Sequence, residues 1–252
     1  MGKLDGKAII VTGAAQGLGR EYGIRLAQDG ARLAIADIKD CGETAERIQM
    51  AGGEVLDLNV DVSSEEQMLE LARKTNERYG RIDGLLNNAG ITKILTTKSI
   101  MDVDMATWDR VYSVHARGTF LGIRAVFPYM KAAGGGTIVN VSSGSMLRIA
   151  RAVDELNVAY VSSKAAIMGI TRAVARELGA HNINVVTIAP GSTTADRDDP
   201  LSPDEAINEP DASLLRRGVP SDLSGVMAFL FSEDAHFISG QMIVVNGGRE
   251  VY

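Results

Sequence analysis

The amino-acid sequence predicts a doubly wound α/β fold, a parallel sheet of seven strands with helices on both faces. Short segments rich in β-branched residues alternate with longer segments of helical periodicity, which is typical of βαβ units. In the short segments the apolar residues stand at consecutive positions, as in Ala8-Ile9-Ile10-Val11, which indicates strands buried on both faces. The expected strands are 8–12, 33–36, 55–60, 82–86, 137–141, 183–188 and 242–245.

Apolar spacing marks the helices between these strands. Leu18, Tyr22 and Leu26 recur at intervals of four residues, and Ser63 and Ser64 are candidate N-caps for the third helix. The chain contains no linker rich in Pro, Gly or Ser, and no repeat of about 20–50 residues, so we expect one domain over 1–252. The expected helices are 17–28, 42–50, 65–79, 105–130, 158–179 and 221–231.

Composition and charge narrow the class of protein. The 252 residues are 45% hydrophobic and 23% charged, enough apolar material for a full core, which excludes a disordered or disulfide-stapled chain. A net charge of −6 argues against nucleic acid and anionic membranes as partners. Cys41 is the single cysteine, no apolar run of about 18 residues occurs, and His181 and His236 are isolated. We therefore expect a cytoplasmic protein without disulfides or a metal site.

The first expected strand leads directly into a glycine-rich loop, Thr-Gly-Ala-Ala-Gln-Gly-Leu-Gly at positions 12–19. Such a loop lets the backbone approach a pyrophosphate, and the helix N-terminus offers free N–H groups. Glycines also form ordinary turns, but their place between a strand and a helix favours a dinucleotide site. The residues assigned to it are Gly13, Gln16, Gly17, Leu18 and Gly19.

The ends of the next strands supply further candidates for this site. Asp37 ends the second strand, where its carboxylate would bind the adenosine ribose and repel a 2′-phosphate; a solvated loop aspartate is the alternative. Ile38 and Lys39 follow it rather than an arginine, so we expect NAD as the cofactor rather than NADP. Asp61 and Val62 are expected beside the adenine. Asn88, Ala89 and Gly90 are expected to bring their own backbone close to the cofactor.

Tyr160 and Lys164 stand four residues apart in one expected helix, so their side chains share a face. A free phenol has a pKa of about 10, and a nearby ammonium would lower that pKa by stabilising the phenolate. The spacing is common, and a surface pair is the alternative interpretation. Here it follows a strand that ends in Ser142 and Ser143, at the edge where ligands of α/β sheets bind.

The order of these motifs resembles that of the classical short-chain dehydrogenases/reductases over nearly the whole chain. The glycine loop, Asn87–Gly90, the Ser142-Ser143 strand end, Tyr160-x-x-x-Lys164 and Pro190-Gly191 occur in the family's order. The resemblance implies a single-domain Rossmann-type fold. It implies Tyr160 as acid/base, Lys164 as the group that binds the nicotinamide ribose and lowers the pKa of Tyr160, and Ser143 as the donor to the substrate oxygen. It also implies that Ile188, Pro190 and Gly191 lie at the cofactor.

His115 departs from the family pattern. The family usually has an asparagine here, in V-N-x-x-G, which holds a water of the proton relay; this chain reads Val-His-Ala-Arg-Gly at 114–118. A structural histidine is the ordinary alternative. Our hypothesis is that His115 anchors the relay water or shuttles the proton itself, which makes it a candidate catalytic residue.

Three loops also depart from the family. The spacing from Ser143 to Tyr160 is 17 residues, about four more than usual. The added turn around 148–156, which includes Arg151, Asp154 and Glu155, is expected to form a wall that faces the substrate. The stretch 90–108 is also long. Ala195 stands where the family often has a threonine, so Thr193 or Thr194 is expected to contact the cofactor carboxamide.

These observations predict an NAD-dependent oxidoreductase that interconverts a secondary alcohol and a ketone. A 3-oxoacyl-[acyl-carrier-protein] reductase is a close alternative, but Asp37 argues against NADPH, and Ala132 and His181 stand where such reductases tend to be basic. A dinucleotide-binding regulator without turnover is a third possibility. By resemblance we expect a homotetramer, and a lid over 192–215, whose acidic residues would disfavour anionic substrates.

Overall fold

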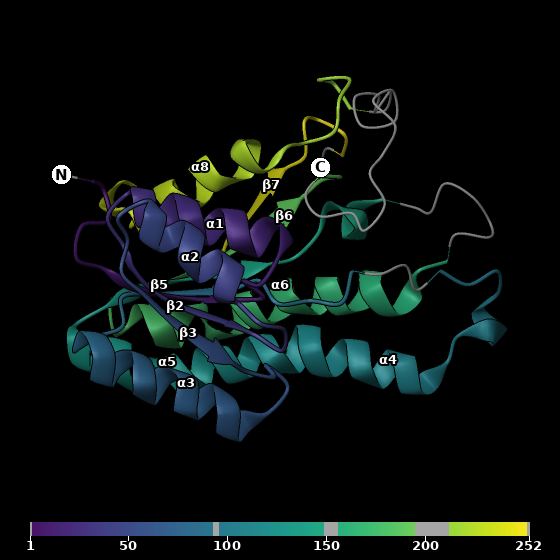
Figure 1. The fold of residues 1–252 in the computed structure, drawn as a ribbon. Helices are drawn as coiled ribbons and strands as arrows, with labels where there is room; N and C mark the ends of the chain where they lie inside the picture. Colours follow the sequence, from purple (N-terminus) through teal and green to yellow (C-terminus); the bar gives the residue numbers. More distant parts are fainter. Residues whose placement is uncertain (1, 93–95, 149–155, 195–211, 251–252) are drawn as a thin grey trace.

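The computed structural model describes residues 2–92, 96–148, 156–194 and 212–250. Seven parallel strands form one sheet in the order β3-β2-β1-β4-β5-β6-β7, so the strand order reverses between β1 and β4 (Figure 1). This confirms the predicted doubly wound sheet. The strands are β1 (Ala8–Thr12), β2 (Arg32–Asp37), β3 (Val55–Asn59), β4 (Gly84–Asn87), β5 (Gly136–Val141), β6 (Ile183–Pro190) and β7 (Met242–Val245).

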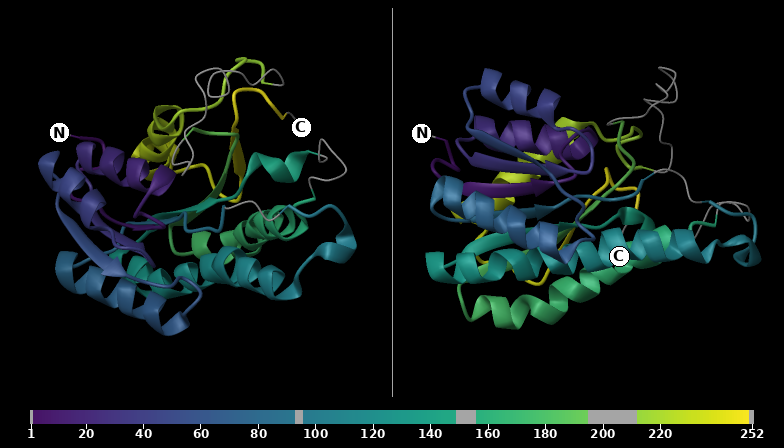
Figure 2. Two further views of the ribbon diagram at one scale, coloured as in Figure 1. Left: turned by 45° about the vertical axis from the view of Figure 1, so that its right-hand side comes forward. Right: turned by 60° about the horizontal axis from the view of Figure 1, so that its bottom comes forward.

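Helices cover both faces of the sheet. The first group lies above it in Figure 1 and contains α1 (Gly17–Gln28), α2 (Gly42–Met50) and α8 (Pro220–Phe231). The second group lies below it and contains α3 (Glu65–Tyr79), α4 (Met105–Tyr112), α5 (Gly118–Ala133) and α6 (Val158–Gly179), and Figure 2 shows the same division from two other sides. Short 3₁₀ turns occur at Ile100–Asp102, Gly144–Leu147 and Glu233–Ala235.

The alternation of side chains along each strand explains why the strands are apolar throughout. In β1, Ile9 and Val11 belong to the core beneath α1 and α8, whereas Ile10 belongs to the core beneath α3 and α5. All five residues of β1 are buried. Because helices cover both faces of the sheet, side chains on neither face meet water, and the strand is hydrophobic at consecutive positions.

Two expected elements differ from the structure. The predicted helix 105–130 is α4 and α5 joined by a π-helical turn, η2 (Ser113–Arg117), which contains His115, and it continues to Ala133. The fourth strand begins at Gly84 rather than at Ile82, and the preceding Asp83 carboxylate accepts a hydrogen bond from the Ala8 N–H (2.9 Å) at the entrance of β1.

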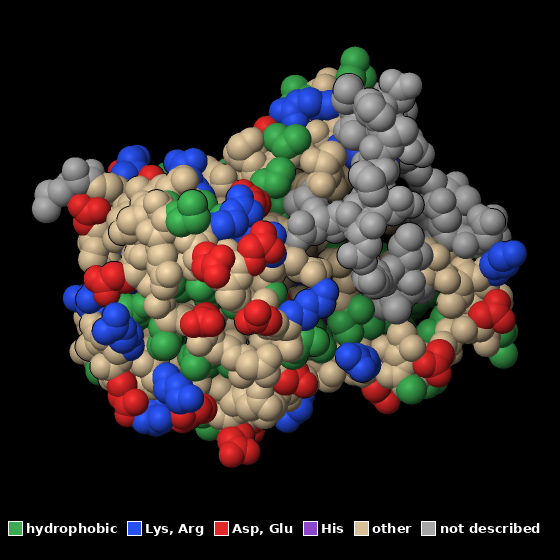
Figure 3. Space-filling view, viewed as in Figure 1, with side chains coloured by type: hydrophobic (Ala, Val, Ile, Leu, Met, Phe, Trp, Pro, Cys, Tyr) green, Lys and Arg blue, Asp and Glu red, His purple; other side chains and the backbone are tan. Residues whose placement is uncertain are grey.

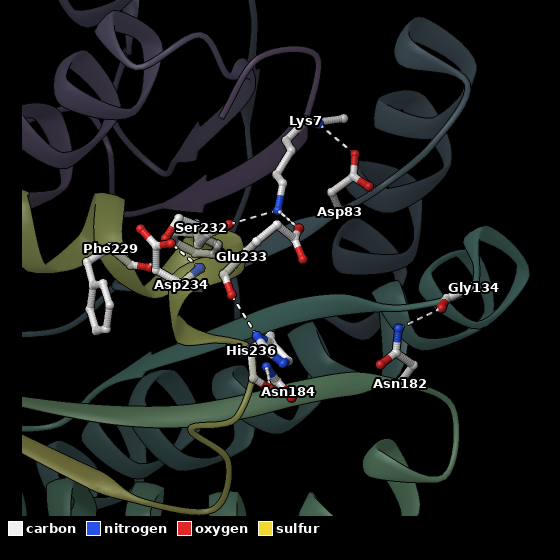
Figure 4. Close-up of polar contacts among 12 residues, drawn as sticks. Lys7, Asp83, Gly134, Asn182, Asn184, Phe229, Ser232, Glu233, Asp234 and His236 are labelled. Atoms are coloured by element: carbon white, nitrogen blue, oxygen red, sulfur yellow. Dashed lines mark hydrogen bonds and ion pairs between the residues drawn. The ribbon is translucent and has the colours of Figure 1, made fainter. Parts of the chain in front are cut away.

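Polar contacts tie the loops together at the amino edge of the sheet (Figure 4). The Lys7 ammonium donates to the Phe231 carbonyl (3.0 Å) at the end of α8 and to Glu233 (2.7 Å). Asn184, at the start of β6, donates to the His236 carbonyl (2.6 Å). These contacts stabilise the amino edge of the sheet. The candidate site lies at the opposite edge, at the carboxyl ends of the strands.

The outer surface carries charges of both signs. On the face in Figure 3, the described Lys and Arg side chains are interspersed with Asp and Glu rather than collected into one basic patch. Among the helices that the structure describes, none has the length and apolar character needed to cross a membrane.

The amino-edge contacts predict a change in stability without a change in activity. We expect Lys7→Ala to lower the free energy of unfolding by about 1–2 kcal/mol, because a partly buried ammonium and its two acceptors lose their bonds. Lys3→Ala is the matched control, because the Lys3–Asp234 pair is exposed on both sides and should contribute less than about 1 kcal/mol. Urea unfolding measures both values, and a loss of turnover in Lys7→Ala would contradict the assignment of this edge to stability alone.

Candidate active site

The glycine loop has a backbone that only glycine accommodates without strain. Gly13 and Gly17 have φ of +68° and +62°, in the left-handed region. A Cβ at Gly13 would lie 2.6 Å from Ala89 Cα, and one at Gly19 would lie 2.0 Å from the Gly13 carbonyl oxygen. The loop therefore packs directly against the end of β4 with no room for side chains.

Hydrogen bonds fix the loop to β4. The Thr12 hydroxyl donates to the Leu86 carbonyl (3.2 Å) and accepts from the backbone N–H groups of Asn88 (3.1 Å) and Ala89 (3.2 Å). The Asn88 side-chain amide donates to the carbonyls of Thr12 (3.0 Å) and Gly13 (3.1 Å). Asn88, expected at the cofactor, thus uses its side chain to hold the glycine loop.

The N-terminus of α1 is open to an anion. Its N-cap residue, Gln16, makes no capping hydrogen bond, and the first turn of α1 contains no acidic residue. N–H groups in that position carry partial positive charge and favour a phosphate. The glycine cradle and this uncapped helix end fit the pyrophosphate of a nicotinamide dinucleotide.

Asp37 lies beside the glycine loop. Its carboxylate accepts from the N–H of Ala15 (3.1 Å) and from the N–H of Lys39 (3.0 Å). The Lys39 ammonium donates to the Gln16 side chain (2.6 Å). Asp37 and Lys39 thus contact neighbouring residues of the glycine loop, Ala15 and Gln16. A carboxylate held in this position fits the ribose-binding role expected from the sequence.

The remaining cofactor candidates also lie at the carboxyl edge. The Asp61 carboxylate accepts from the N–H (2.9 Å) and hydroxyl (2.7 Å) of Ser63, and Val62 is buried after β3. Gly191 follows β6, donates its N–H to the Val245 carbonyl (3.0 Å), and is too close to Asn246 for a side chain. Thr193 forms a parallel bridge with Gly218.

Tyr160 lies in the first turn of α6 and Ser143 directly after β5. The Ser143 hydroxyl accepts from the N–H (3.2 Å) and the hydroxyl (2.9 Å) of Ser145, which leaves its own proton for Tyr160 or for a substrate oxygen. The Lys164 ammonium lies 5.9 Å from the centre of the Tyr160 ring and donates to the Val141 carbonyl (2.9 Å). The structure therefore brings together Ser143, Tyr160 and Lys164, three of the four residues expected to carry the chemistry.

Burial sets the charge states of this group. It raises the pKa of Tyr160, while a hydrogen bond with Ser143 and the positive charge of Arg148 lower it. Burial also lowers the pKa of Lys164 to about 8. Tyr160 is thus a neutral phenol at neutral pH, suited to donate a proton to an oxygen that Ser143 also binds.

His115 is fully buried in the π-helical turn η2, and both of its ring nitrogens are bonded to protein groups. Nε2 accepts from the Ile91 N–H (2.9 Å), and Nδ1 lies 2.8 Å from the Ser163 hydroxyl. Burial and then the charge of Lys164 lower the pKa of His115 to about 2. The hypothesis of a proton shuttle at His115 does not fit this arrangement, because no ring nitrogen is free to take up a relayed proton.

Two residues near the site, Ser163 and Glu250, were not singled out from the sequence, and Arg148 was expected only as the first residue of the added stretch 148–156. Ser163 donates to the Tyr160 carbonyl (2.9 Å); its place three residues after Tyr160, on the same helix face, was the available signal. The positive charge of Arg148 lowers the pKa of Tyr160, and Arg148 pairs with Glu250 (3.7 Å). The Glu250 carboxylate packs against Gly144, where an added Cβ would lie 3.0 Å from it. No local pattern joins Glu250 to a site about 100 residues away.

Several expectations fall outside the described residues. Arg151, Asp154 and Glu155 lie there, as does most of the expected lid, 195–211, together with Ala195. Among the residues that the structure describes, no three His, Cys, Asp or Glu side chains gather in a way that could hold a metal ion.

Comparison with known proteins finds relatives over nearly the whole chain. A family model described as enoyl-(acyl carrier protein) reductase matches residues 13–250. A 3-oxoacyl-[acyl-carrier-protein] reductase of Staphylococcus epidermidis is 34% identical over 248 residues, covering 96% of this chain and 98% of that protein. Levodione reductase of Leifsonia aquatica is 33% identical over 257 residues, covering 96% of this chain and 94% of that protein. The crystal structure of carveol dehydrogenase from Mycobacterium avium, in complex with NAD, superposes with a TM-score of 0.89 at 26% identity, covering 99% of each chain.

The chain belongs to the short-chain dehydrogenases/reductases. It is therefore an oxidoreductase of a family that binds a nicotinamide cofactor and acts on small-molecule substrates.

The contact between Gly19 and the Gly13 carbonyl predicts a selective loss of cofactor binding. We expect Gly19→Ala to weaken dinucleotide binding by at least about tenfold, because the added methyl displaces the loop. Gly169→Ala, in α6, is the matched control: its Cβ meets no atom within 4 Å, so the change should leave binding intact and slightly increase stability. Calorimetric titration measures both affinities, and equal affinities would contradict the account of the loop.

The charge of Arg148 predicts a shift in the pH dependence of alcohol oxidation. Arg148→Ala removes a positive charge that stabilises the Tyr160 phenolate, so the pKa of Tyr160 should rise. Oxidation needs the phenolate as base, so the rising limb of the pH–rate profile should move to higher pH, and kcat/KM at neutral pH should fall about threefold to tenfold. Arg148→Lys keeps the charge and should retain more of the wild-type profile. A limb unmoved in Arg148→Ala would show that this charge does not act on the base.

Proposed function

We propose that this chain is an NAD-dependent oxidoreductase that interconverts a secondary alcohol and a ketone by hydride transfer. The observation that carries the proposal is the placement of Tyr160 beside Ser143 and Lys164 at the same sheet edge as the glycine loop and Asp37. An acid/base group and a dinucleotide cradle at one edge suit chemistry on a carbonyl or alcohol oxygen.

The preference for NAD rests on Asp37. Its carboxylate lies against the loop at Ala15, and it would repel the additional phosphate of NADP. The cation nearest to Asp37 in the sequence, Lys39, stands two residues later and donates to the Gln16 side chain. The carveol dehydrogenase that superposes on this chain was crystallised with NAD, which also supports this choice.

The residues of this chain have distinct roles in the proposed reaction. When bound, the nicotinamide ring supplies the hydride for ketone reduction and accepts it in alcohol oxidation. Ser143 donates a hydrogen bond to the substrate oxygen, and Tyr160 gives that oxygen its proton as the alcohol forms. Lys164 supplies positive charge near the phenolate that remains, and it is the candidate ligand of the nicotinamide ribose. In oxidation, Tyr160 takes the proton back.

We assign substrate specificity to the two lengthened loops. Thr97, in the loop after β4, and Leu156, four residues before Tyr160, exchange two backbone hydrogen bonds (2.8 and 3.1 Å). The two loops therefore meet beside the first turn of α6. Their extra length and this contact support the proposal that together they form a wall of the substrate pocket. We keep the lid over 192–215, the homotetramer and the cytoplasmic location as predictions.

A carrier-protein reductase is the second candidate. The Staphylococcus epidermidis relative at 34% identity supports it, whereas Asp37 disfavours the NADPH preference expected for that role. The experiment is a panel of ketones, secondary alcohols, diols and one 3-oxoacyl thioester, each assayed with NADH or NAD and with the NADP forms. Best turnover of a simple ketone or alcohol with NAD(H) supports the proposal; best turnover of the thioester with NADPH overturns it. Dinucleotide binding without turnover would favour a regulator.

Asp37 predicts a change of cofactor preference. Asp37→Ser removes the carboxylate, so the ratio of kcat/KM with NADH to kcat/KM with NADPH should fall at least about tenfold. Asp40→Ser is the control, because Asp40 is an exposed acid three residues further on, and its loss should leave the ratio unchanged. A ratio that is unchanged in Asp37→Ser would contradict the role of Asp37 in selecting NAD.

A further inference from the structure

His115 contacts both the loop after β4, through Ile91, and the helix α6 that carries Tyr160, through Ser163. The residue lies in the π-helical turn between α4 and α5 and is completely buried. Single π-helical turns inside α-helices often occur at functional sites. The imidazole meets the Tyr160 ring edge-on, with 5.6 Å between ring centres and an interplanar angle of 81°.

The hydrogen-bond partners determine where the imidazole proton lies. The Ile91 N–H can only donate, so Nε2 accepts and carries no proton. A neutral imidazole then has its proton on Nδ1, which donates to the Ser163 hydroxyl (2.8 Å). The Ser163 hydroxyl in turn donates a hydrogen bond to the Tyr160 carbonyl (2.9 Å), which can only accept. The chain Ile91 to His115 to Ser163 to Tyr160 is therefore satisfied in one direction only.

The surroundings keep this imidazole neutral. The imidazole is buried, Lys164 is a cation on the same face of α6 as Tyr160, and the pKa of His115 is lowered to about 2. A charged imidazolium would also carry a proton on Nε2, facing the Ile91 N–H. Protonation would thus break the contact with the loop after β4.

The same contacts join the loop after β4 to α6. A Cβ at Gly90 would lie 3.1 Å from His115 Nε2 and 3.5 Å from Lys164 Nζ, so the imidazole and the lysine both lie close to the loop at Gly90. Gly90 and Ile91 follow Asn88 and Ala89, which bind the glycine loop through Thr12. Hydrogen bonds therefore connect the cofactor-side loop, through His115 and Ser163, to the backbone of Tyr160.

We propose that His115 is a positioning residue, which as a neutral Nδ1–H imidazole couples the loop at Gly90 and Ile91 to the backbone of Tyr160 through Ser163. This rests on the proposed function only in taking Tyr160 as the acid/base group. No proton passes through the imidazole. Its role is to keep the phenol and the cofactor-side loop in one relative position, on which the rate of hydride transfer depends.

The first test needs no substrate. Nitrogen-15 NMR of the histidine-labelled protein should show one buried imidazole with Nδ1 protonated and Nε2 unprotonated from about pH 5 to about pH 9. His115→Asn should remove that signal and so assign it. A signal that titrates in this range, or the opposite tautomer, would overturn the proposal whether or not a substrate is known.

The second test is a double-mutant cycle with His115→Leu and Ser163→Ala. Each should lower kcat by about tenfold or more with little change in the substrate KM, because positioning is lost rather than substrate binding. Since the two side chains form one chain of hydrogen bonds, the double variant should lose no more than the worse single variant. Losses that multiply would contradict the coupling, as would a kcat unchanged in both.

Matched controls separate positioning from general damage. Ser162→Ala removes a neighbouring hydroxyl that bonds the helix carbonyls of Val158 (2.5 Å) and Ala159 (3.4 Å), and it should leave kcat unchanged. Ser163→Thr keeps the hydroxyl and should recover most of the rate. Dinucleotide affinity and thermal unfolding, measured on every variant, show whether the fold is retained. If the wild type turns over no ketone, the proposed function fails while the NMR result still decides the state of His115.

Discussion

The junction between β1 and β4 is the constraint on which the rest of the site depends. The strand order reverses there, and in open α/β sheets ligands bind beyond the carboxyl ends of the strands at such a reversal. Thr12 and Asn88 close the junction with five hydrogen bonds, and the glycines at 13 and 19 bring the two loop backbones into contact. Because the loop after β4 is held here, its next residues, Gly90 and Ile91, reach His115 in a defined position.

Burial is the second organising effect. His115 and Lys164 are buried and Tyr160 is half-buried beside them, and burial shifts each pKa in the direction that favours the neutral form. Ser143 and Arg148 act in the opposite direction on Tyr160. Acid/base chemistry at the phenol is thus set by a balance between burial and two specific neighbours. The buried histidine stays neutral, so Lys164 is not joined by a second cation.

The sequence predicted the features that depend on local pattern. The strands were predictable because residues such as Ile9 and Ile10 point to opposite faces that are both covered. The relation of Tyr160 to Lys164 follows from helix geometry. The π-helical turn was not predictable, because Ser113–Arg117 has no breaker residue that distinguishes it from an α-helix. The His115–Ser163 contact spans 48 residues, and Arg148 meets Glu250 from the other end of the chain. Such pairs arise from packing, which local patterns do not encode.

In the proposed reaction, the cofactor cradle and Tyr160 act on one substrate carbon and its oxygen. The most direct measurement is the reduction of the best ketone substrate with NADH deuterated at the transferring position, followed by mass spectrometry and NMR of the alcohol. The account predicts deuterium on the former carbonyl carbon and solvent hydrogen on oxygen, with turnover lost in Tyr160→Phe. Product without deuterium at that carbon, or unchanged turnover in Tyr160→Phe, would contradict it.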